Sequence, residues 1–375
     1  MQIIPVASGK GGVGKSLFSA NLAVALGQAG KKVILADLDL GASNLHLVIG
    51  HQAPKNGIGT YLTGASDFKD IIVQTEYPNV SFIPGDSEIP GLSTVKASQK
   101  NDLIRKLRTC EADYLIIDLG AGTHLTILDM FLMSAQGIIV SAPTVTAILN
   151  GYLFLKNVVF RLMYNSFRKN SRAYAFMEKI RLDSASMQRL YIPKLIDAIE
   201  RIDKPSCDAF RAHLEQFHPR LVLNMIDDPK DTDKAHKIRR SCKEYLGVDL
   251  ELLGAIYRDS MQDKALASRL PVIAYKPQAV ISQAIYRIAD KICMSQEQAF
   301  SMGGADSFEL AASEAEDDFS AKLSFIEDLV GSGALTMGEL AETIKQQQYE
   351  LTQLKKENTL LKSKLIKASQ QGFRL

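Results

Sequence analysis

Short apolar runs alternate with helix-like stretches along the chain up to about residue 295. The runs are brief enough to be buried strands, and they lie at 3–7, 32–36, 80–85, 114–118, 137–141, 221–226 and 254–257. Helices are expected between them, for example over 17–26, where Leu22, Ala23 and Leu26 share one face. This alternation predicts an α/β fold with a mostly parallel sheet flanked by helices.

Residues 130–155 carry no charged side chain, which raises the question of a membrane-spanning helix. Pro143, Asn150 and several serines and threonines interrupt the stretch, and 137–141 has the composition of a buried parallel strand. We therefore expect a strand, a loop and a core helix here rather than a membrane span.

The turn between the first predicted strand and the first predicted helix carries a phosphate-binding motif. It reads Gly9-Lys10-Gly11-Gly12-Val13-Gly14-Lys15-Ser16, matches G-x-x-x-x-G-K-[ST] at every position, and leads into the helix at Leu17. Glycines let backbone N–H groups turn inward around an anion, and the helix N-terminus adds about half a positive charge there. Lys15 supplies a full charge for the β- and γ-phosphates, and Ser16 offers a hydroxyl to Mg²⁺. The motif therefore predicts a phosphate-loop NTPase.

Acidic residues follow two of the predicted strands, at the edge where open α/β sheets bind ligands. Asp37 and Asp39 are two residues apart after the second strand, so both side chains can face the phosphates. Asp118 ends another apolar strand, where phosphate-loop enzymes place an acidic group that holds the Mg²⁺ shell. The glycines of 120–122 let the backbone approach a γ-phosphate and move when it leaves. The alternative for Asp37 and Asp39 is a pair of turn-capping aspartates, and the alternative for Asp118 is an acidic strand-end residue of the kind found in any α/β protein.

Composition narrows the class of protein without identifying a ligand. A chain of 375 residues can bury a large core and hold two domains. The net charge of +2 favours no particular partner, and the four cysteines form no C-x-x-C pair. Their separation argues against a metal or iron–sulfur site and fits a reducing compartment. Because a strand is predicted almost at the N-terminus, we expect no signal peptide and a cytoplasmic location.

The phosphate loop contains a second lysine, Lys10, which the general motif does not require. With it, the sequence K-G-G-x-G-K-S resembles the deviant phosphate loop of the MinD/ParA family of ATPases. The resemblance covers about residues 1–160 and 220–295. It implies ATP and Mg²⁺ as cofactors and a homodimer in which Lys10 reaches the phosphates bound by the partner subunit. A surface lysine without such a role is the alternative.

The same resemblance implies roles for residues beyond the loop. Residues 37–44 match the family's first switch, D-x-D-x-x-x-x-N, in which Asp39 positions the attacking water and Asn44 supports the switch. Asn224, on the strand at 221–226, is expected to contact adenine. Motif and resemblance together predict a catalytic set of Lys10, Lys15, Asp39 and Asn44, a nucleotide-binding set of Gly9, Lys10, Gly11, Gly12, Val13, Gly14, Lys15, Ser16, Leu17 and Asn224, and a metal set of Ser16, Asp39 and Asp118.

Residues 161–219 depart from the family pattern, which has a short connection at this point. They are rich in helix formers, so we predict an inserted helical subdomain within an ATPase domain of residues 1–298. Its middle part is basic, with Arg168, Lys169, Arg172, Lys179, Arg181 and Arg189 against Glu178 and Asp183. This surface could meet nucleic acid, anionic lipid or an acidic partner, or only solvent.

The sequence after residue 298 predicts a linker and a helical tail. Residues 299–318 are acidic and favour a flexible linker, followed by an amphipathic helix at 319–330 and a Gly-Ser-Gly break at 331–333. Apolar positions then alternate by four and three, with Asn358 at an a position, which favours a short parallel coiled coil. The a and d positions are Leu340, Ile344, Gln347, Leu351, Leu354, Asn358, Leu361 and Leu365. The basic end of the tail also fits peripheral contact with the inner face of the cell membrane, and a solvated helix is the third alternative.

Within the family, the stretch after Asp39 looks most like MinD and the flagellar-placement branch, FlhG/FleN. We therefore expect an ATP-dependent switch that dimerises on Mg-ATP, hydrolyses ATP slowly, answers to an activating protein partner and places division or flagellar machinery. A ParA-type partition ATPase that binds DNA is the first alternative. A metabolic enzyme of the cobyrinate or dethiobiotin synthase type is disfavoured because it has no need of Lys10. A scaffold built on the coil is disfavoured by the intact Lys15, Asp39 and Asp118.

Overall fold

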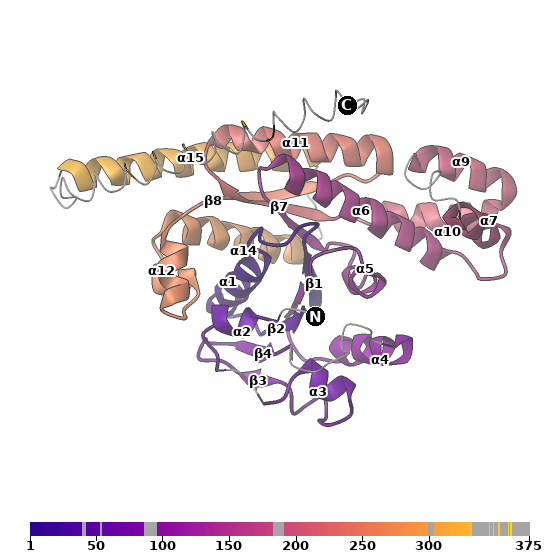
Figure 1. Cartoon of the computed structure of the whole chain (residues 1–375), viewed down its shortest axis with the longest axis horizontal. Helices are drawn as coiled ribbons and strands as arrows, with labels where there is room; N and C mark the ends of the chain where they lie inside the picture. Colours follow the sequence, from indigo (N-terminus) through magenta and orange to yellow (C-terminus); the bar gives the residue numbers. More distant parts are fainter. Residues whose placement is uncertain are drawn as a thin grey trace. The chain divides into compact units, whose positions relative to one another are not determined.

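A single sheet occupies the centre of the N-terminal part of the chain, in the strand order β3-β4-β2-β5-β1-β6-β7-β8. Figure 1 shows it in the computed structural model. The strands are β1 (Gln2–Ala7), β2 (Val33–Leu38), β3 (Val73–Gln74), β4 (Val80–Ile83), β5 (Tyr114–Leu119), β6 (Ile138–Ser141), β7 (Arg220–Ile226) and β8 (Glu251–Tyr257). Every pairing is parallel except that of β3 with β4. The predicted α/β fold with a mostly parallel sheet is confirmed.

The structure describes residues 1–39, 43–52, 55–85, 96–182, 191–298 and 304–331, and the single positions 345, 348, 352, 359 and 361. It divides into two compact units, Met1–Phe319 and Ser320–Leu375. The helices are α1 (Lys15–Gln28), α2 (Leu45–Val48), α3 (Ile58–Leu62), α4 (Ala97–Arg108), α5 (Leu125–Phe131), α6 (Val145–Ser166), α7 (Arg172–Leu182), α9 (Ile192–Ile202), α10 (Lys204–Glu215), α11 (Thr232–Ser241), α12 (Met261–Ala267), α13 (Val272–Tyr275), α14 (Val280–Gln298) and α15 (Gly304–Gly331), with short turns η1 (Pro229–Asp231) and η2 (Cys242–Leu246).

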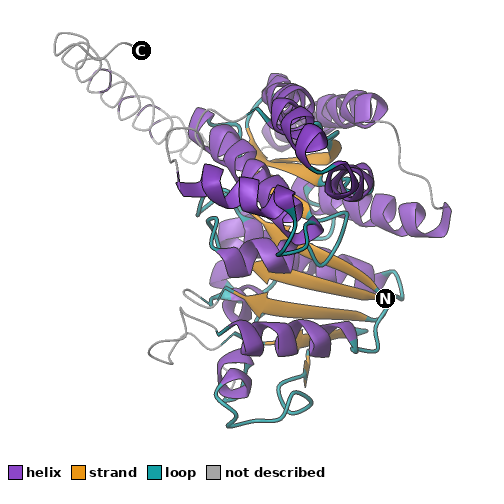
Figure 2. Ribbon diagram, turned by 90° about the vertical axis from the view of Figure 1, so that its right-hand side faces the viewer, coloured by secondary structure: helices purple, strands orange, loops and turns teal. Residues whose placement is uncertain are grey.

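Helices cover both faces of the sheet, as Figure 2 shows. The core beneath α1 and α14 contains Phe18, Leu22 and Ile285, and the core beneath α5 and α6 contains Phe131 and Phe154. All six residues of β2 and of β5 are buried. A parallel strand that is covered on both faces has no solvent side, which explains why these strands are nearly continuous apolar runs.

Helix α6 contains residues 145–155, the last part of the uncharged segment that raised the question of a membrane span. In the described part of the chain, it alone is long and apolar enough to cross a membrane by length and composition. Its Phe154, Val158 and Met163 are fully buried in the core beside the sheet. This burial agrees with the expected core helix.

The insertion after α6 is helical, as predicted, and consists of α7, α9 and α10 in its described residues. It does not form a compact unit of its own, because it lies within the unit Met1–Phe319. Phe167 and Phe210 are buried in the same core as the sheet residues, and their rings pack edge to face. The predicted start at residue 161 falls inside α6, and Arg189 lies outside the described residues.

The prediction of a flexible acidic linker over 299–318 was wrong for its described part. Residues 304–318 are the first half of α15, and the unit boundary falls at Phe319 rather than at residue 298. Phe308, Ala311 and Ala315 are fully buried at a spacing of three and four, so one face of this segment packs on the domain. The acidity that suggested a linker has a structural use, since Glu314 and Asp318 form ion pairs with Lys291 and Arg287 of α14.

The coiled-coil tail remains a prediction. Of its a and d positions, only Leu361 is a described residue, and it is helical and 58% exposed. The other positions lie outside the described residues.

We predict that Phe308→Ala lowers the free energy of unfolding by about 3–5 kcal/mol, because it removes a ring that packs against His236 and under the Arg239 guanidinium. Urea unfolding measures this loss. The control is Leu323→Ala on the same helix, where the side chain is 46% exposed and the change should stay within about 0.5 kcal/mol. Equal small effects of both changes would contradict the packing of α15 on the domain.

Candidate functional site

The phosphate loop joins β1 to α1 at the carboxyl edge of the sheet. Gly12 and Gly14 have φ values of 77° and 83°, which place both in the left-handed region that favours glycine. Lys15 is the first residue of the 14-residue helix α1, so the loop ends at a helix N-terminus. The predicted strand–loop–helix context of the motif is therefore present.

At two positions of the loop only glycine fits, because residues from distant parts of the chain lie against its Cα atom. A Cβ atom at Gly9 would overlap the backbone carbonyl of Asn150 in α6, and one at Gly14 would overlap the side-chain amide of Asn224 in β7. The loop is thus held between α6 and β7. The motif identifies these glycines, but only the tertiary structure shows what they make room for.

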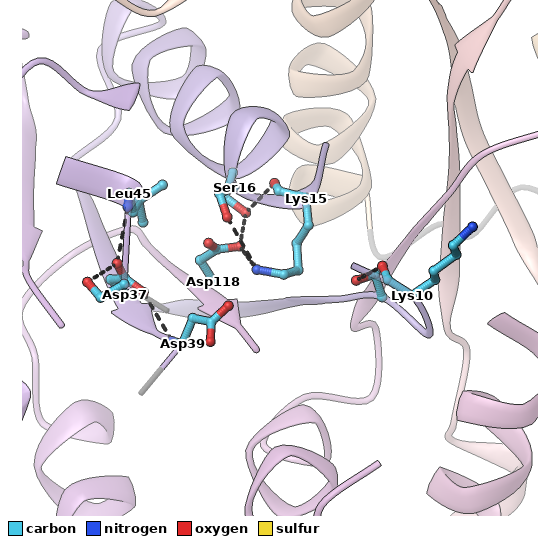
Figure 3. Close-up of polar contacts among 10 residues, drawn as sticks. Lys10, Lys15, Ser16, Asp37, Asp39, Leu45 and Asp118 are labelled. Carbon is cyan, nitrogen blue, oxygen red and sulfur yellow. Dashed lines mark hydrogen bonds and ion pairs between the residues drawn. The ribbon is translucent and has the colours of Figure 1, made fainter. Parts of the chain in front are cut away.

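Lys15 is buried and paired inside its own chain. Its Nζ lies 2.9 Å from Asp118 Oδ1, and the two side chains are 7% and 1% exposed. The Ser19 hydroxyl donates to the same oxygen at 3.0 Å. Figure 3 shows this cluster beneath the loop, with Ser16 beside it. Binding of phosphate to Lys15 would therefore replace one anionic partner by another.

A second buried carboxylate lies next to Asp118. Asp37 is 1% exposed and is the register partner of Asp118 across β2 and β5. Burial, and then the charge of Asp118, raise the pKa of Asp37 to about 6. Two adjacent carboxylates beside one lysine leave excess negative charge at this edge of the sheet.

The residues fit a magnesium ion. Asp118 Oδ2 is buried without a hydrogen-bond partner, and the Ser16 hydroxyl lies beside Lys15 Nζ at 3.4 Å. Among the described residues, no group of three or more His, Cys, Asp or Glu side chains could hold a metal ion by itself. Mg²⁺ typically uses one or two protein oxygens together with waters and substrate phosphates, so Ser16 and Asp118 suffice when a nucleotide is present.

Asp37 also ties two loops to the site. It accepts hydrogen bonds from the backbone N–H groups of Asp39 and Leu45, and its Oδ2 lies 2.7 Å from the Ser43 hydroxyl. That hydroxyl lies 2.8 Å from the carbonyl oxygen of Gly85. The sequence left the role of Asp37 open, and the structure makes it the anchor of the segment that begins at Asp39.

Asp39 lies half-buried between the two predicted switch segments. A Cβ atom at Gly120 would be only 3.0 Å from Asp39 Oδ1, so the glycine admits the carboxylate to this position. Asn44 is exposed and precedes α2, and residues 40–42 between the two lie outside the described residues. The structure therefore brings Asp39 to Asp37 and Asp118 but places Asn44 at the rim.

The second lysine of the loop points away from the phosphate site. Lys10 and Lys15 extend to opposite sides of the loop in Figure 3. Lys10 is exposed, and its Nζ donates to Thr146 Oγ1 in the first turn of α6 at 3.1 Å. In this arrangement Lys10 does not serve the nucleotide of its own chain.

Asn224 is 4% exposed, and its amide Nδ2 donates to the carbonyl oxygen of Val13 at 2.9 Å. The sequence predicts a contact with adenine, which stays a prediction. Ser19, Thr146 and Asn150 are site residues that the sequence reasoning missed. Only Ser19 left a signal, since it follows Lys15 by four residues and so shares its face of α1.

Comparison with known proteins places this site in a family. An AAA domain family model matches residues 1–170. The flagellum site-determining protein YlxH of Helicobacter pylori is 35% identical over 157 residues, which is 41% of this chain and 53% of that protein. The septum site-determining protein MinD of Synechocystis is 33% identical over 149 residues, 39% of this chain and 55% of that protein. Over this N-terminal part, the chain is similar to the MinD/ParA family of P-loop ATPases.

Solved structures of MinD/ParA proteins share the fold over a longer part of the chain. The MinD protein of Pyrococcus horikoshii, solved with Mg-ADP, is 21% identical with a TM-score of 0.55 and covers 80% of this chain and 99% of that one. A ParA family ATPase from Chlorobium tepidum is 18% identical with a TM-score of 0.52 and covers 77% and 98%. The chain spans about half the length of the curated relatives it matches.

We predict that Gly9→Ala destabilises the protein by about 1–3 kcal/mol or more, because backbone atoms of Asn150 occupy the space that a methyl group needs. Thermal unfolding of the ligand-free protein measures it. Gly11→Ala is the matched control on the same loop, since nothing lies within 4 Å of its Cβ position and its φ is not positive. Its effect should stay within about 0.5 kcal/mol. Equal destabilisation by both changes would contradict the packing of the loop on α6.

Proposed function

We propose that this protein is an ATP-dependent molecular switch that dimerises on Mg-ATP and hydrolyses ATP slowly. The observation that carries the proposal is the orientation of Lys10. An exposed lysine within a phosphate loop repels Lys15 unless negative charge comes to it, and it points away from its own phosphate site. The phosphates of a second subunit, brought face to face with the loop, would supply that charge.

Within each subunit, the buried cluster prepares the phosphate site. Lys15 exchanges Asp118 for the β- and γ-phosphates, while the backbone N–H groups of the loop surround the same anion. Ser16 and Asp118 would hold Mg²⁺, which neutralises phosphate charge when bound. Asp39, positioned against Gly120, orients the water that attacks the γ-phosphate.

The two segments next to the γ-phosphate provide the switch. Asp37 holds Ser43 and, through it, Gly85, so the segment that follows Asp39 is anchored at its far end. Hydrolysis removes the γ-phosphate contacts of Asp39 and Gly120, and the two segments relax. The ADP state then lacks the γ-phosphate charge that attracts Lys10 from the other subunit, and the dimer loosens.

We further propose that the switch acts in the cytoplasm in placing division or flagellar machinery, together with an activating protein partner. The support is the similarity to site-determining proteins, YlxH and MinD, and to the antiactivator FleN of Pseudomonas aeruginosa, which is 28% identical over 158 residues. These matches cover about half of each relative.

We expect Mg-ATP, but not Mg-ADP, to raise the light-scattering mass from that of one chain, 41.2 kDa, toward twice that value. Lys10→Ala should abolish the increase because it removes the charge that crosses to the partner's phosphates. Lys69→Ala, which changes an exposed lysine away from the loop, is the matched control. The same series in a chain that ends at residue 334 separates the switch from the predicted coil. If the mass is the same with ADP and ATP and changes only when residues 335–375 are removed, the Lys10 model is wrong.

Asp39→Asn should lower kcat for ATP hydrolysis by about 100-fold and leave ATP affinity nearly unchanged, because the carboxylate acts on the attacking water. A phosphate-release assay gives the rate, and calorimetry gives the affinity. Asp67→Asn, at an exposed aspartate outside the site, should change neither. Undiminished turnover of the Asp39 variant would remove it from the mechanism.

A further inference from the structure

The amide of Asn224 joins the phosphate loop to a strand that is not its neighbour. Asn224 and Val13 are 211 positions apart, and β6 separates β7 from β1 in the sheet. The hydrogen bond from Nδ2 to the Val13 carbonyl oxygen is buried. This buried hydrogen bond constrains the position of the loop. If it broke, both the Asn224 amide and the Val13 carbonyl would be left buried without a partner, which costs free energy.

The backbone next to Asn224 is distorted in a way that serves this contact. Met225 has a φ of 59°, in the left-handed region that a residue with a side chain rarely adopts. The register of β7 on β8 shifts between Asn224 and Ile226, as at a β-bulge. Bulges turn a side chain in a new direction, and strained residues cluster at functional sites.

The loop is shaped to receive the amide. Gly14 has a φ of 83°, and a Cβ there would overlap Asn224 Nδ2 and come within 3.5 Å of the end of the Met225 side chain. In a trans peptide the C=O of one residue and the N–H of the next point in opposite directions. A bond that holds Val13 C=O toward β7 therefore turns the Gly14 N–H away from β7.

We propose that Asn224 is a positioning residue for the phosphate loop: it fixes the Val13–Gly14 peptide so that the Gly14 N–H faces the bound phosphates. The bulge at Met225 directs the Asn224 amide toward the loop, and the absence of a side chain at Gly14 leaves room for that amide. This role rests on the proposed nucleotide site, and it differs from that of an adenine reader. A positioning residue acts on any polyphosphate, whereas an adenine reader acts only on the base.

The test compares Mg²⁺ complexes of ATP, GTP and inorganic tripolyphosphate by calorimetry on the full chain. Asn224→Ala should weaken all three by a common factor of about ten, the effect of one lost hydrogen bond. Asn224→Asp, which keeps the shape but sets a carboxylate against the Val13 carbonyl, should weaken them at least as much and guards against misfolding of the alanine variant. A loss confined to ATP, with tripolyphosphate affinity unchanged, would overturn the proposal in favour of base recognition.

Asn21→Ala controls for the loss of a buried asparagine as such. Asn21 is fully buried in α1, where it bonds Leu17 and Ile273 rather than the loop. It should lower the melting temperature without changing tripolyphosphate affinity. Weakening by Asn21→Ala equal to that by Asn224→Ala would mean that general destabilisation explains both, and would overturn the positioning role.

Hydrogen exchange of residues 9–16 in the ligand-free protein decides the inference independently of nucleotide binding. Exchange in this loop should speed up by about tenfold in Asn224→Ala and stay unchanged in Asn21→Ala. Unchanged loop exchange in Asn224→Ala would refute the inference. Failure of the wild type to bind any of the three ligands would refute the proposed function instead.

Discussion

Lys15 and Asp118 form an ion pair that is almost entirely buried at the carboxyl edge of the sheet, and the chemistry of the site depends on it. Removing either charge from water costs several kcal/mol unless the other is in contact with it. The neighbouring Asp37 adds a second carboxylate whose pKa is raised to about 6 by burial and by Asp118. The cluster is stable without a ligand, but it is unbalanced toward negative charge. In the proposed nucleotide site, the phosphates would take Asp118's place beside Lys15, and a divalent cation would offset the charge of the carboxylates.

The loop above this pair owes its shape to elements that surround it. Helix α6 supplies the Asn150 carbonyl against Gly9 and the Thr146 hydroxyl that holds Lys10, and β7 supplies the Asn224 amide. The same α6 supports the inserted helices, whose aromatic side chains join its core. An insertion far from the loop in sequence thus packs on a helix that touches the loop directly.

Patterns within short segments predicted most of the fold. The strands were recognisable because both faces of each are buried, and the site carboxylates because they follow those strands. The same local reasoning failed at residues 304–318, where acidic composition outweighed a helical spacing of Phe308, Ala311 and Ala315. Composition describes how a segment behaves alone, whereas its structure here also depends on the burial of Phe308, Ala311 and Ala315 and on ion pairs with α14.

The sequence by itself determined the phosphate loop, the carboxylates that follow the strands and the resemblance to MinD/ParA proteins, because a nest of backbone N–H groups and a strand-end carboxylate are local features. The tertiary structure alone decided that Lys10 leans on α6, that Asp37 anchors Ser43 and Gly85, and that Asn224 faces Val13 rather than solvent. Most of these contacts join residues far apart in the chain, and their geometry depends on which strands and helices become neighbours. No local pattern records that adjacency, so it could be known only from the folded chain.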